Sequence, residues 1–297
     1  MTALVRAAAD VAMRWNYRVW GFGEEIALAG LLRAGDLLGD PAPSAFVHGL
    51  MRAWLGRGVA RSNEDHVGPG RILLAMHKRT GDDRFVDAAR ALAALNAGFP
   101  RGPNGIRFHR ADTPGWRQQI WVDCMDIDGP FLAALAVATG EDRYFEQAVE
   151  ELLGSARTLQ AESGLLHHGF ERDAGRNGQL WARGNGWALM GLVDTLALLP
   201  RSHPAWAELH QRTVALADAL AAAQDPGGLW HTVVDDPATY LESTLAAMVA
   251  YALREAFAHD VLDAARHGDM ERRARAAMHA QVDAAGVLRL VSEATPV

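Results

Sequence analysis

The chain has 297 residues, of which 49% are hydrophobic and 22% are charged, and its formal net charge at pH 7 is -7. This composition is typical of a globular protein with a sizeable buried core. The negative charge argues against a nucleic-acid-binding protein, because binding to a phosphate backbone requires a basic face.

Cysteine usage and the N-terminal segment bear on the cellular compartment. Cys124 is the only cysteine, so neither an intrachain disulfide nor a cysteine-based zinc site can form. Residues 1–15 contain no long apolar run, and no stretch of the chain is long enough to span a membrane. We therefore expect a cytoplasmic protein that has no membrane partner.

Helical periodicity dominates the chain, with apolar residues recurring three and four positions apart. The intervening breaks are rich in Gly, Asp and Pro, as turns are. The predicted helices are 3–16, 24–38, 43–55, 69–80, 83–97, 128–140, 142–160, 185–199, 203–223, 240–257 and 260–279. Because no flexible linker or composition break interrupts them, we predict one all-α domain over residues 1–297.

Two of the breaks resemble each other and indicate a weak repeat of helical hairpins. They run from Thr80 to Phe85 and from Thr139 to Tyr144, each with a Gly that ends one helix and acids that favour the next. Longer irregular segments hold much of the Trp, His, Gly and Asn. They are 56–68, 98–127, 161–184 and 224–239. Hairpins joined by such loops predict an (α/α) toroid whose long loops gather on one face and build a site.

The segment from Trp121 to Phe131 carries three carboxylates, Asp123, Asp126 and Asp128, beside a tryptophan. If it enters a helix, Asp123 and Asp126 share one face. Crowded carboxylates and an apolar wall raise a carboxyl pKa, which allows a protonated acid to act as general acid near neutral pH. The same pattern also occurs at the start of an ordinary helix.

The segment from Trp181 to Trp187 reads Trp-Ala-Arg-Gly-Asn-Gly-Trp. Indoles stack on sugar rings, and the Arg183 guanidinium can bind a carboxylate with two hydrogen bonds. The adjacent His167 and His168 point in different directions, so we expect no metal pair, one polar site residue and one structural residue. Residues 63–70 form a polar loop before a helix, which favours a capping role when taken alone.

In order, these motifs resemble the unsaturated glucuronyl and rhamnogalacturonyl hydrolases, glycoside hydrolase families 88 and 105. The matching elements run over residues 15–295, and the 181–187 string is the most specific of them. The others are Asp65 in a Pro-Gly loop, Gln119 to Asp123 with Pro130 to Leu132, His168-Gly169, Glu242-Ser243, Ala247-Met248 and Ala250-Tyr251.

The resemblance implies an (α/α)6 barrel without a metal or organic cofactor. It also implies a small oligosaccharide substrate with a 4,5-unsaturated uronic acid at its non-reducing end. Carried over by position, Asp123 would be the general acid and base, with Asp65 as a second acidic residue. His168 would contact the unsaturated ring, Trp181 would stack on it and Arg183 would bind its carboxylate. Further substrate contacts are expected from the same motifs, at Gln119, Trp121, Asn185 and Trp187.

Three departures from the family pattern lead to expectations of their own. Asp126 and Asp128 stand where relatives usually carry uncharged residues, so a uronate can bind only if these acids are paired or protonated. Arg110 is the nearest counterpart of a Lys that rhamnogalacturonyl hydrolases often carry before the catalytic Asp. With eleven predicted helices, one inner wall of the barrel is either missing or supplied by a partner subunit, which favours a homo-oligomer.

Two alternatives remain open at this point. One is a toroid enzyme on another sugar, a conventional glycosidase or an epimerase, with the three aspartates as an acid cluster. The other is a non-catalytic sugar-binding protein on the same scaffold. The released sugar and its linkage do not follow from the sequence.

Overall fold

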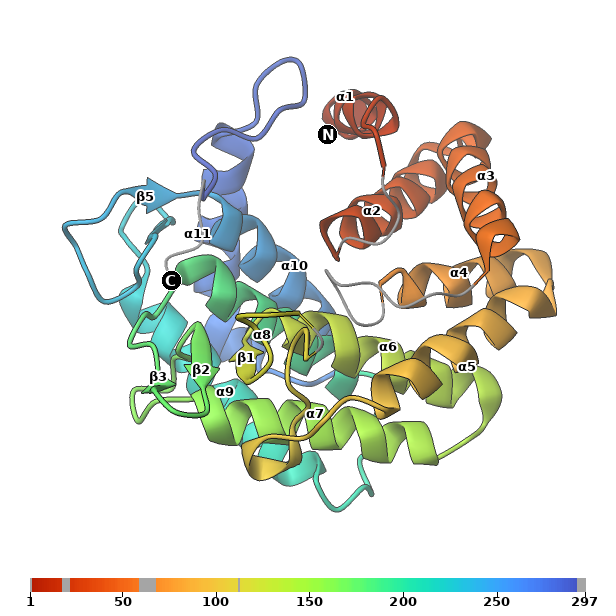
Figure 1. Ribbon diagram of the computed structural model, residues 1–297. Helices are drawn as coiled ribbons and strands as arrows, with labels where there is room; N and C mark the ends of the chain where they lie inside the picture. The colour runs from red at the N-terminus through yellow and green to blue at the C-terminus, as the bar shows by residue number, and fades with distance from the viewer. Residues whose placement is uncertain (1, 18–21, 59–67, 112, 293–297) are drawn as a thin grey trace.

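The computed structural model describes residues 2–17, 22–58, 68–111 and 113–292, and its helices form two concentric layers (Figure 1). The first helices are α1 (Thr2–Met13), α2 (Phe22–Leu38), α3 (Pro41–Arg57), α4 (Gly70–Thr80), α5 (Asp83–Ala97) and α6 (Cys124–Thr139). The remaining ones are α7 (Arg143–Leu159), α8 (Ala182–Leu196), α9 (Trp206–Ala223), α10 (Thr244–Ala258) and α11 (Ala264–Ala280). The all-α prediction and its eleven helical segments are confirmed.

The even-numbered helices form the inner ring, in which α2 packs on α4, α4 on α6, α6 on α8 and α8 on α10. The odd-numbered helices pack outside them. Most residues of α6 and α8 are buried, as expected for helices that are apolar around most of their circumference. This is the predicted helical toroid. None of the described helices is long and apolar enough to cross a membrane.

The predicted hairpin repeat is confirmed at atomic detail. Gly81 and Gly140 both adopt the left-handed conformation that ends a helix, with φ of 70° and 69°. The hydroxyl groups of Thr80 and Thr139 each donate to the carbonyl four residues earlier, at 2.7 Å. Two similar sequences therefore build the same turn between α4 and α5 and between α6 and α7.

The start of α6 lies at Cys124, four residues before the predicted start at 128, so Gly129 and Pro130 lie farther inside the helix than predicted. A Cβ on Gly129 would lie 2.8 Å from the side chain of Leu152 on α7. The glycine thus permits close packing of two helices and does not end one.

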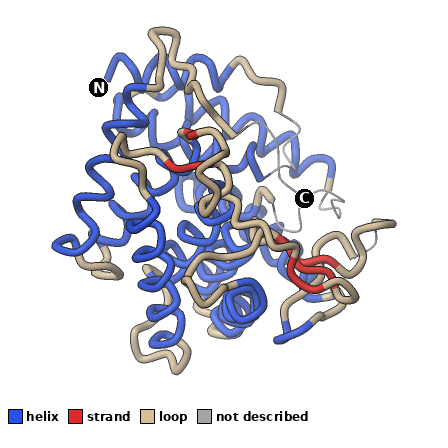
Figure 2. The backbone as a smooth tube through the Cα atoms, turned by 90° about the vertical axis from the view of Figure 1, so that its left-hand side faces the viewer, coloured by secondary structure: helices blue, strands red, loops and turns tan. Residues whose placement is uncertain are grey.

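Short strands, drawn red in Figure 2, lie in the long loops. Strands β1 (Gln119–Trp121), β2 (Gly169–Glu171) and β3 (Gly175–Arg176) form an antiparallel sheet, and β4 (Trp230–His231) pairs with β5 (Leu241–Glu242). They were not predicted, because two- and three-residue strands carry too little periodicity. Since β1 runs into α6 and β5 into α10, these sheets fix the N-terminal ends of these two inner helices.

The ring is bridged between α10 and α2 by side chains and by the C-terminal turn. Arg33 of α2 donates to Tyr251 and Glu255 of α10, at 3.3 and 3.2 Å. The turn at Gly286 packs against the backbone of Ala7 on α1. Within the described residues no twelfth helix lies between α10 and α2. The expectation of a homo-oligomer stays a prediction.

Candidate active site

Asp123 stands at the N-terminal end of α6, where the register between β1 and β2 places His168 beside it. Trp121 pairs with Gly169, and the Val122 amide donates to the His168 carbonyl at 2.9 Å. This register brings His168 Nε2 to 3.4 Å from Asp123 Oδ2. Two motifs that are 45 residues apart in the sequence therefore meet at one carboxyl group.

Aromatic rings continue from this pair toward α8. The ring of His168 lies 4.5 Å from that of Trp121 and 4.8 Å from that of Trp181, between centroids. The guanidinium of Arg183 lies over the Trp181 ring at 4.2 Å, within the range of a cation–π contact. The predicted residues from β1, the β2 loop and α8 thus form one continuous group.

Among the motif residues of α6 and α8, Asp123 and Arg183 keep partly exposed side chains. The charge of Asp123 acts on Arg183, and so does that of Glu242. Burial lowers the pKa of Arg183, an effect that both acids oppose. An acid and a guanidinium therefore lie near each other at the N-terminal ends of two inner helices.

The two extra acids do not share this exposure, since Asp126 and Asp128 are each 1% exposed. Arg71 Nη2 donates to Asp126 Oδ2 at 2.9 Å, and burial raises the pKa of Asp126. Asp128 lies close enough to Arg107 for its charge to act on that guanidinium. Both acids face an arginine, as uronate binding requires, and neither can reach a substrate.

Several predicted substrate contacts are corrected by the structure. Asn185 is fully buried, and its amide group bonds the backbone of Leu166 and the Trp181 carbonyl. It has a structural role, because it fixes the loop before His168 to α8. Trp187 packs in the hydrophobic core and is 7% exposed, and its role in substrate binding stays a prediction.

Trp181 is also enclosed, so direct stacking on a sugar ring does not fit this arrangement. Its ring is covered by His168 and Arg183, and its indole N–H donates to Ser292 at 3.1 Å. Trp181 therefore supports His168 and Arg183, which pack against its ring. The Gln119 amide donates to the Gly115 carbonyl at 3.2 Å and orders the loop before β1. Its role in substrate binding stays a prediction.

The structure says less about the remaining predicted positions, which are Asp65, His167 and Arg110. Asp65 and most of the 63–70 loop lie outside the described residues. His167 is half-buried, and burial lowers its pKa. Arg110 lies over the ring of Trp116 at 4.8 Å, and Trp116 lies 5.3 Å from Trp121. The described chain contains no group of three or more His, Cys, Asp or Glu side chains that could hold a metal ion.

Sequence reasoning assigned no role to Ser292 and Glu242 at this site. The Ser292 carbonyl accepts a bond from Arg183 Nη1 at 2.6 Å. Glu242 accepts from the backbone amides of Thr244 and Leu245, and so satisfies the first turn of α10. The acid at a helix start was a signal for Glu242, whereas no local pattern pointed to Ser292.

Residues 6–297 of the chain match the family described as Glycosyl Hydrolase Family 88. The chain belongs to this family. It is 30% identical over 214 residues to the unsaturated rhamnogalacturonyl hydrolase YesR of Bacillus subtilis, a match that covers 69% of this chain and 62% of that protein. The matched segment is therefore less than two thirds of that relative's length.

Solved structures show the same fold. One is a possible member of family GH105 from Salmonella enterica, with a TM-score of 0.88, 22% identity, and coverage of 99% of this chain and 84% of that chain. Another is the unsaturated glucuronyl hydrolase from Bacillus sp. GL1, with a TM-score of 0.77, 19% identity, and coverage of 98% and 87%. The described helices thus follow the helical barrel of this glycoside hydrolase group.

Proposed function

We propose that this protein is a hydrolase that releases a 4,5-unsaturated uronic acid from the non-reducing end of small oligosaccharides made by polysaccharide lyases. The observation that carries the proposal is the grouping of Asp123, His168 and Arg183 at the N-terminal ends of α6 and α8. The family match supports it, and so does the YesR relative, whose name states this kind of activity.

In this reaction the Asp123 carboxyl group gives its proton to C4 of the C4=C5 double bond, which leaves positive charge at C5 shared with the ring oxygen. A water molecule adds to C5 and returns a proton to the Asp123 carboxylate. The resulting hemiketal opens to a ketone, and the hemiacetal left at C1 expels the remaining sugar as an alcohol. One water is consumed, and Asp123 ends protonated as it began.

Each neighbouring group has a defined part in these steps. Arg183 binds the uronate carboxylate beside C5, because a guanidinium matches the geometry of a carboxylate. His168 holds the Asp123 carboxyl group in place through its Nε2 contact. Asp65 is proposed to bind sugar hydroxyls, as the resemblance implies. A positioned general acid of this kind contributes about 10²- to 10⁴-fold to a rate.

The acid-cluster alternative receives less support, because Asp126 and Asp128 are buried against arginines. A conventional inverting glycosidase needs a second carboxyl group about 6.5–9.5 Å from the first across a cleft. Glu242, the nearby acid, is 0% exposed and both of its oxygens bond backbone amides. Glu242 is therefore a poor general base.

The proposal also covers the setting of the enzyme. The single cysteine favours the cytoplasm, and the net charge of -7 disfavours nucleic acid as a partner. We propose one domain over residues 1–297 that acts without a cofactor, in a homo-oligomer whose size light scattering would measure.

The test is to incubate the purified protein with unsaturated disaccharides from pectic, glycosaminoglycan and ulvan-type lyase digests. Turnover removes the conjugated double bond, so its ultraviolet absorbance falls. Loss of the signal with one of these substrates supports the proposal and identifies the substrate class. If no disaccharide is consumed while saturated sugars are hydrolysed or epimerised, the proposal is wrong.

A further inference from the structure

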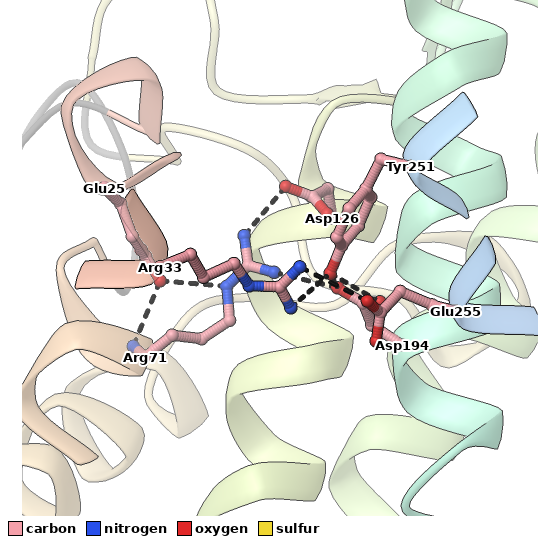
Figure 3. Close-up of polar contacts among 7 residues, drawn as sticks. All are labelled: Glu25, Arg33, Arg71, Asp126, Asp194, Tyr251 and Glu255. Atoms are coloured by element: carbon pink, nitrogen blue, oxygen red, sulfur yellow. Dashed lines mark hydrogen bonds and ion pairs between the residues drawn. The ribbon is translucent and has the colours of Figure 1, made fainter. Parts of the chain in front are cut away.

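A network of charged side chains and one tyrosine lies between the inner helices of the barrel (Figure 3). It joins all five inner helices of the described chain, α2, α4, α6, α8 and α10. We call it the axial network, and its members are Glu25, Arg33, Arg71, Asp126, Asp194, Tyr251 and Glu255. The reaction proposed above uses none of them.

Arg71, the first residue after the start of α4, is the centre of this network. Its Nε and its backbone amide both donate to Glu25 Oε1 at 3.0 Å. Its Nη2 donates to Asp126 at 2.9 Å and its Nη1 to Asp194 at 3.3 Å. Burial alone would lower the pKa of Arg71, but the three acids together raise it above its ordinary value. Arg71 is thus a permanent cation held by three acids, on α2, α6 and α8.

The bond to Asp126 connects Arg71 with the catalytic carboxyl group. Asp126 lies one helical turn after Asp123, and its amide donates to the Asp123 carbonyl at 3.2 Å. Whatever fixes the Asp126 side chain therefore fixes the turn that Asp123 begins. Helices α4 and α6 also pack closely next to Arg71, because a Cβ on Gly70 would lie 2.4 Å from the Phe131 ring of α6.

The structure assigns Arg71 as a positioning residue: through Asp126 it holds the first turn of α6, and with it the Asp123 carboxyl group, in register with the substrate. This inference rests on the proposed function. It also explains why α6 carries a buried acid at position 126, where an uncharged side chain would leave Arg71 without its link to α6.

Removing Arg71 is expected to affect turnover more than binding. Arg71→Met leaves Asp126 buried without its partner, which is costly, and the first turn of α6 shifts. A misplacement of about 1 Å can lower a rate by about 100-fold. We expect kcat to fall at least about tenfold, with KM changed less than about threefold, the split that marks a loss in the transition state. Arg71→Lys should be intermediate, because an ammonium cannot bond three carboxylates in a fixed plane.

The matched control is Arg79→Met, on the same helix. Arg79 also pairs with an acid of α2, through two bonds to Asp36 at 2.9 and 2.5 Å, but it lies in the last turn of α4, at the opposite end from Arg71. A general loosening of the α2–α4 contact would lower kcat in both variants. Positioning through Asp126 lowers kcat only in Arg71→Met.

The double variant Arg71→Met with Asp126→Asn separates positioning from simple loss of stability. It removes the unpaired charge at position 126, so the free energy of unfolding should recover toward that of the wild type, whereas kcat should stay low because the link from α4 to the first turn of α6 is still absent. Crystal structures of the variants provide a readout independent of activity, in which Arg71→Met should move the Asp123 carboxyl group away from His168.

The outcomes distinguish the two proposals. A wild-type protein that consumes no unsaturated disaccharide contradicts the proposed function. If the wild type is active, the inference is overturned when Arg71→Met keeps its kcat, when Arg79→Met loses as much, or when Asp123 keeps its place beside His168 in the Arg71→Met crystal structure.

Discussion

His168 Nε2 lies 3.4 Å from Oδ2 of Asp123, and its imidazole is 1% exposed between the rings of Trp121 and Trp181. Rings on both sides leave the imidazole one orientation, so the direction of the Asp123 carboxyl group is set by packing. A proton donor held this way needs little rearrangement before it reacts. Asp123 itself remains partly exposed, which gives a substrate access to the carboxyl group.

Replacing Asp123 by asparagine should abolish turnover and spare binding. The amide has the same shape but supplies no proton at C4, so kcat should fall by about 10³-fold or more. Loss of double-bond absorbance measures kcat, and calorimetric titration with the unsaturated disaccharide measures affinity. An Asp123→Asn variant with unchanged activity would show that another group protonates the substrate.

Replacing Arg183 by lysine should weaken substrate binding more than it slows chemistry. Lysine keeps the charge but loses the planar pair of donors, and it cannot both bond the Ser292 carbonyl and bind a carboxylate side-on. We expect KM to rise about tenfold with a smaller change in kcat, corresponding to about 1.4 kcal/mol. Steady-state kinetics over a range of disaccharide concentrations checks this.

The control for Arg183→Lys is Arg172→Lys. Arg172 lies over the Phe108 ring, outside the group formed by Asp123, His168 and Arg183, so its KM should stay near that of the wild type. Equal KM values for Arg183→Lys and the wild type would contradict the role of Arg183 as carboxylate ligand.

The helices could be predicted from the sequence because each depends on local patterns. The repeated Thr-Gly-acid turns, for example, contain their own capping groups, so the two turns follow from six residues each. The inner position of α8 follows from its apolar circumference in the same way. The start of α6 at Cys124 could not be predicted, because the strand just before it, β1, forms only by pairing with β2 at residues 169–171.

The site residues also fall into two groups, those that a local motif indicates and those whose role depends on distant contacts. Asp123, His168 and Arg183 could be proposed because each lies in a distinctive motif, and the register of β1 with β2 then joins two of them. The 181–187 motif also suggested a substrate contact for Asn185, but only the fold shows that its amide group bonds the backbone of Leu166. The partners of Arg71 lie 46, 55 and 123 residues away in the sequence, a distance over which no local pattern operates.

Gly191 of α8 should be intolerant of even one methyl group. A Cβ there would lie 2.1 Å from the backbone carbonyl oxygen of Met125 on α6, and backbone atoms cannot rotate away. Gly191→Ala should therefore push α6 and α8 apart and lower the free energy of unfolding by about 3 kcal/mol. Gly49→Ala on α3, where nothing lies within 4 Å, should raise it by about 0.5–1 kcal/mol. Urea denaturation of both variants measures the difference, and a stable Gly191→Ala variant would contradict the close crossing.

Asp194 should make the stability of the protein depend on pH between about 5 and 8. Burial raises its pKa from the ordinary 3.8 to about 7, although Arg71 opposes the shift. Between these two values the folded state binds more protons than the unfolded state, so stability falls as pH rises and levels off above 7. The difference between pH 5 and pH 8 is about 2–3 kcal/mol for this group.

Asp194→Asn isolates this contribution. Asparagine can accept the bonds from Arg71 and Tyr251 but does not ionise, so the variant should gain about 2–3 kcal/mol relative to the wild type on going from pH 5 to pH 8.

Comparison with the variant is needed because His167, whose pKa is lowered, contributes with the opposite sign in the same range. Asp82 and Glu208, whose pKa values are both lowered to about 2, lose their contributions only as pH falls below about 5. Urea denaturation of both proteins at pH 5 and pH 8 gives the four free energies. An equal difference between the two proteins at both pH values would show that Asp194 is ionised throughout, and that Arg71 compensates its burial completely.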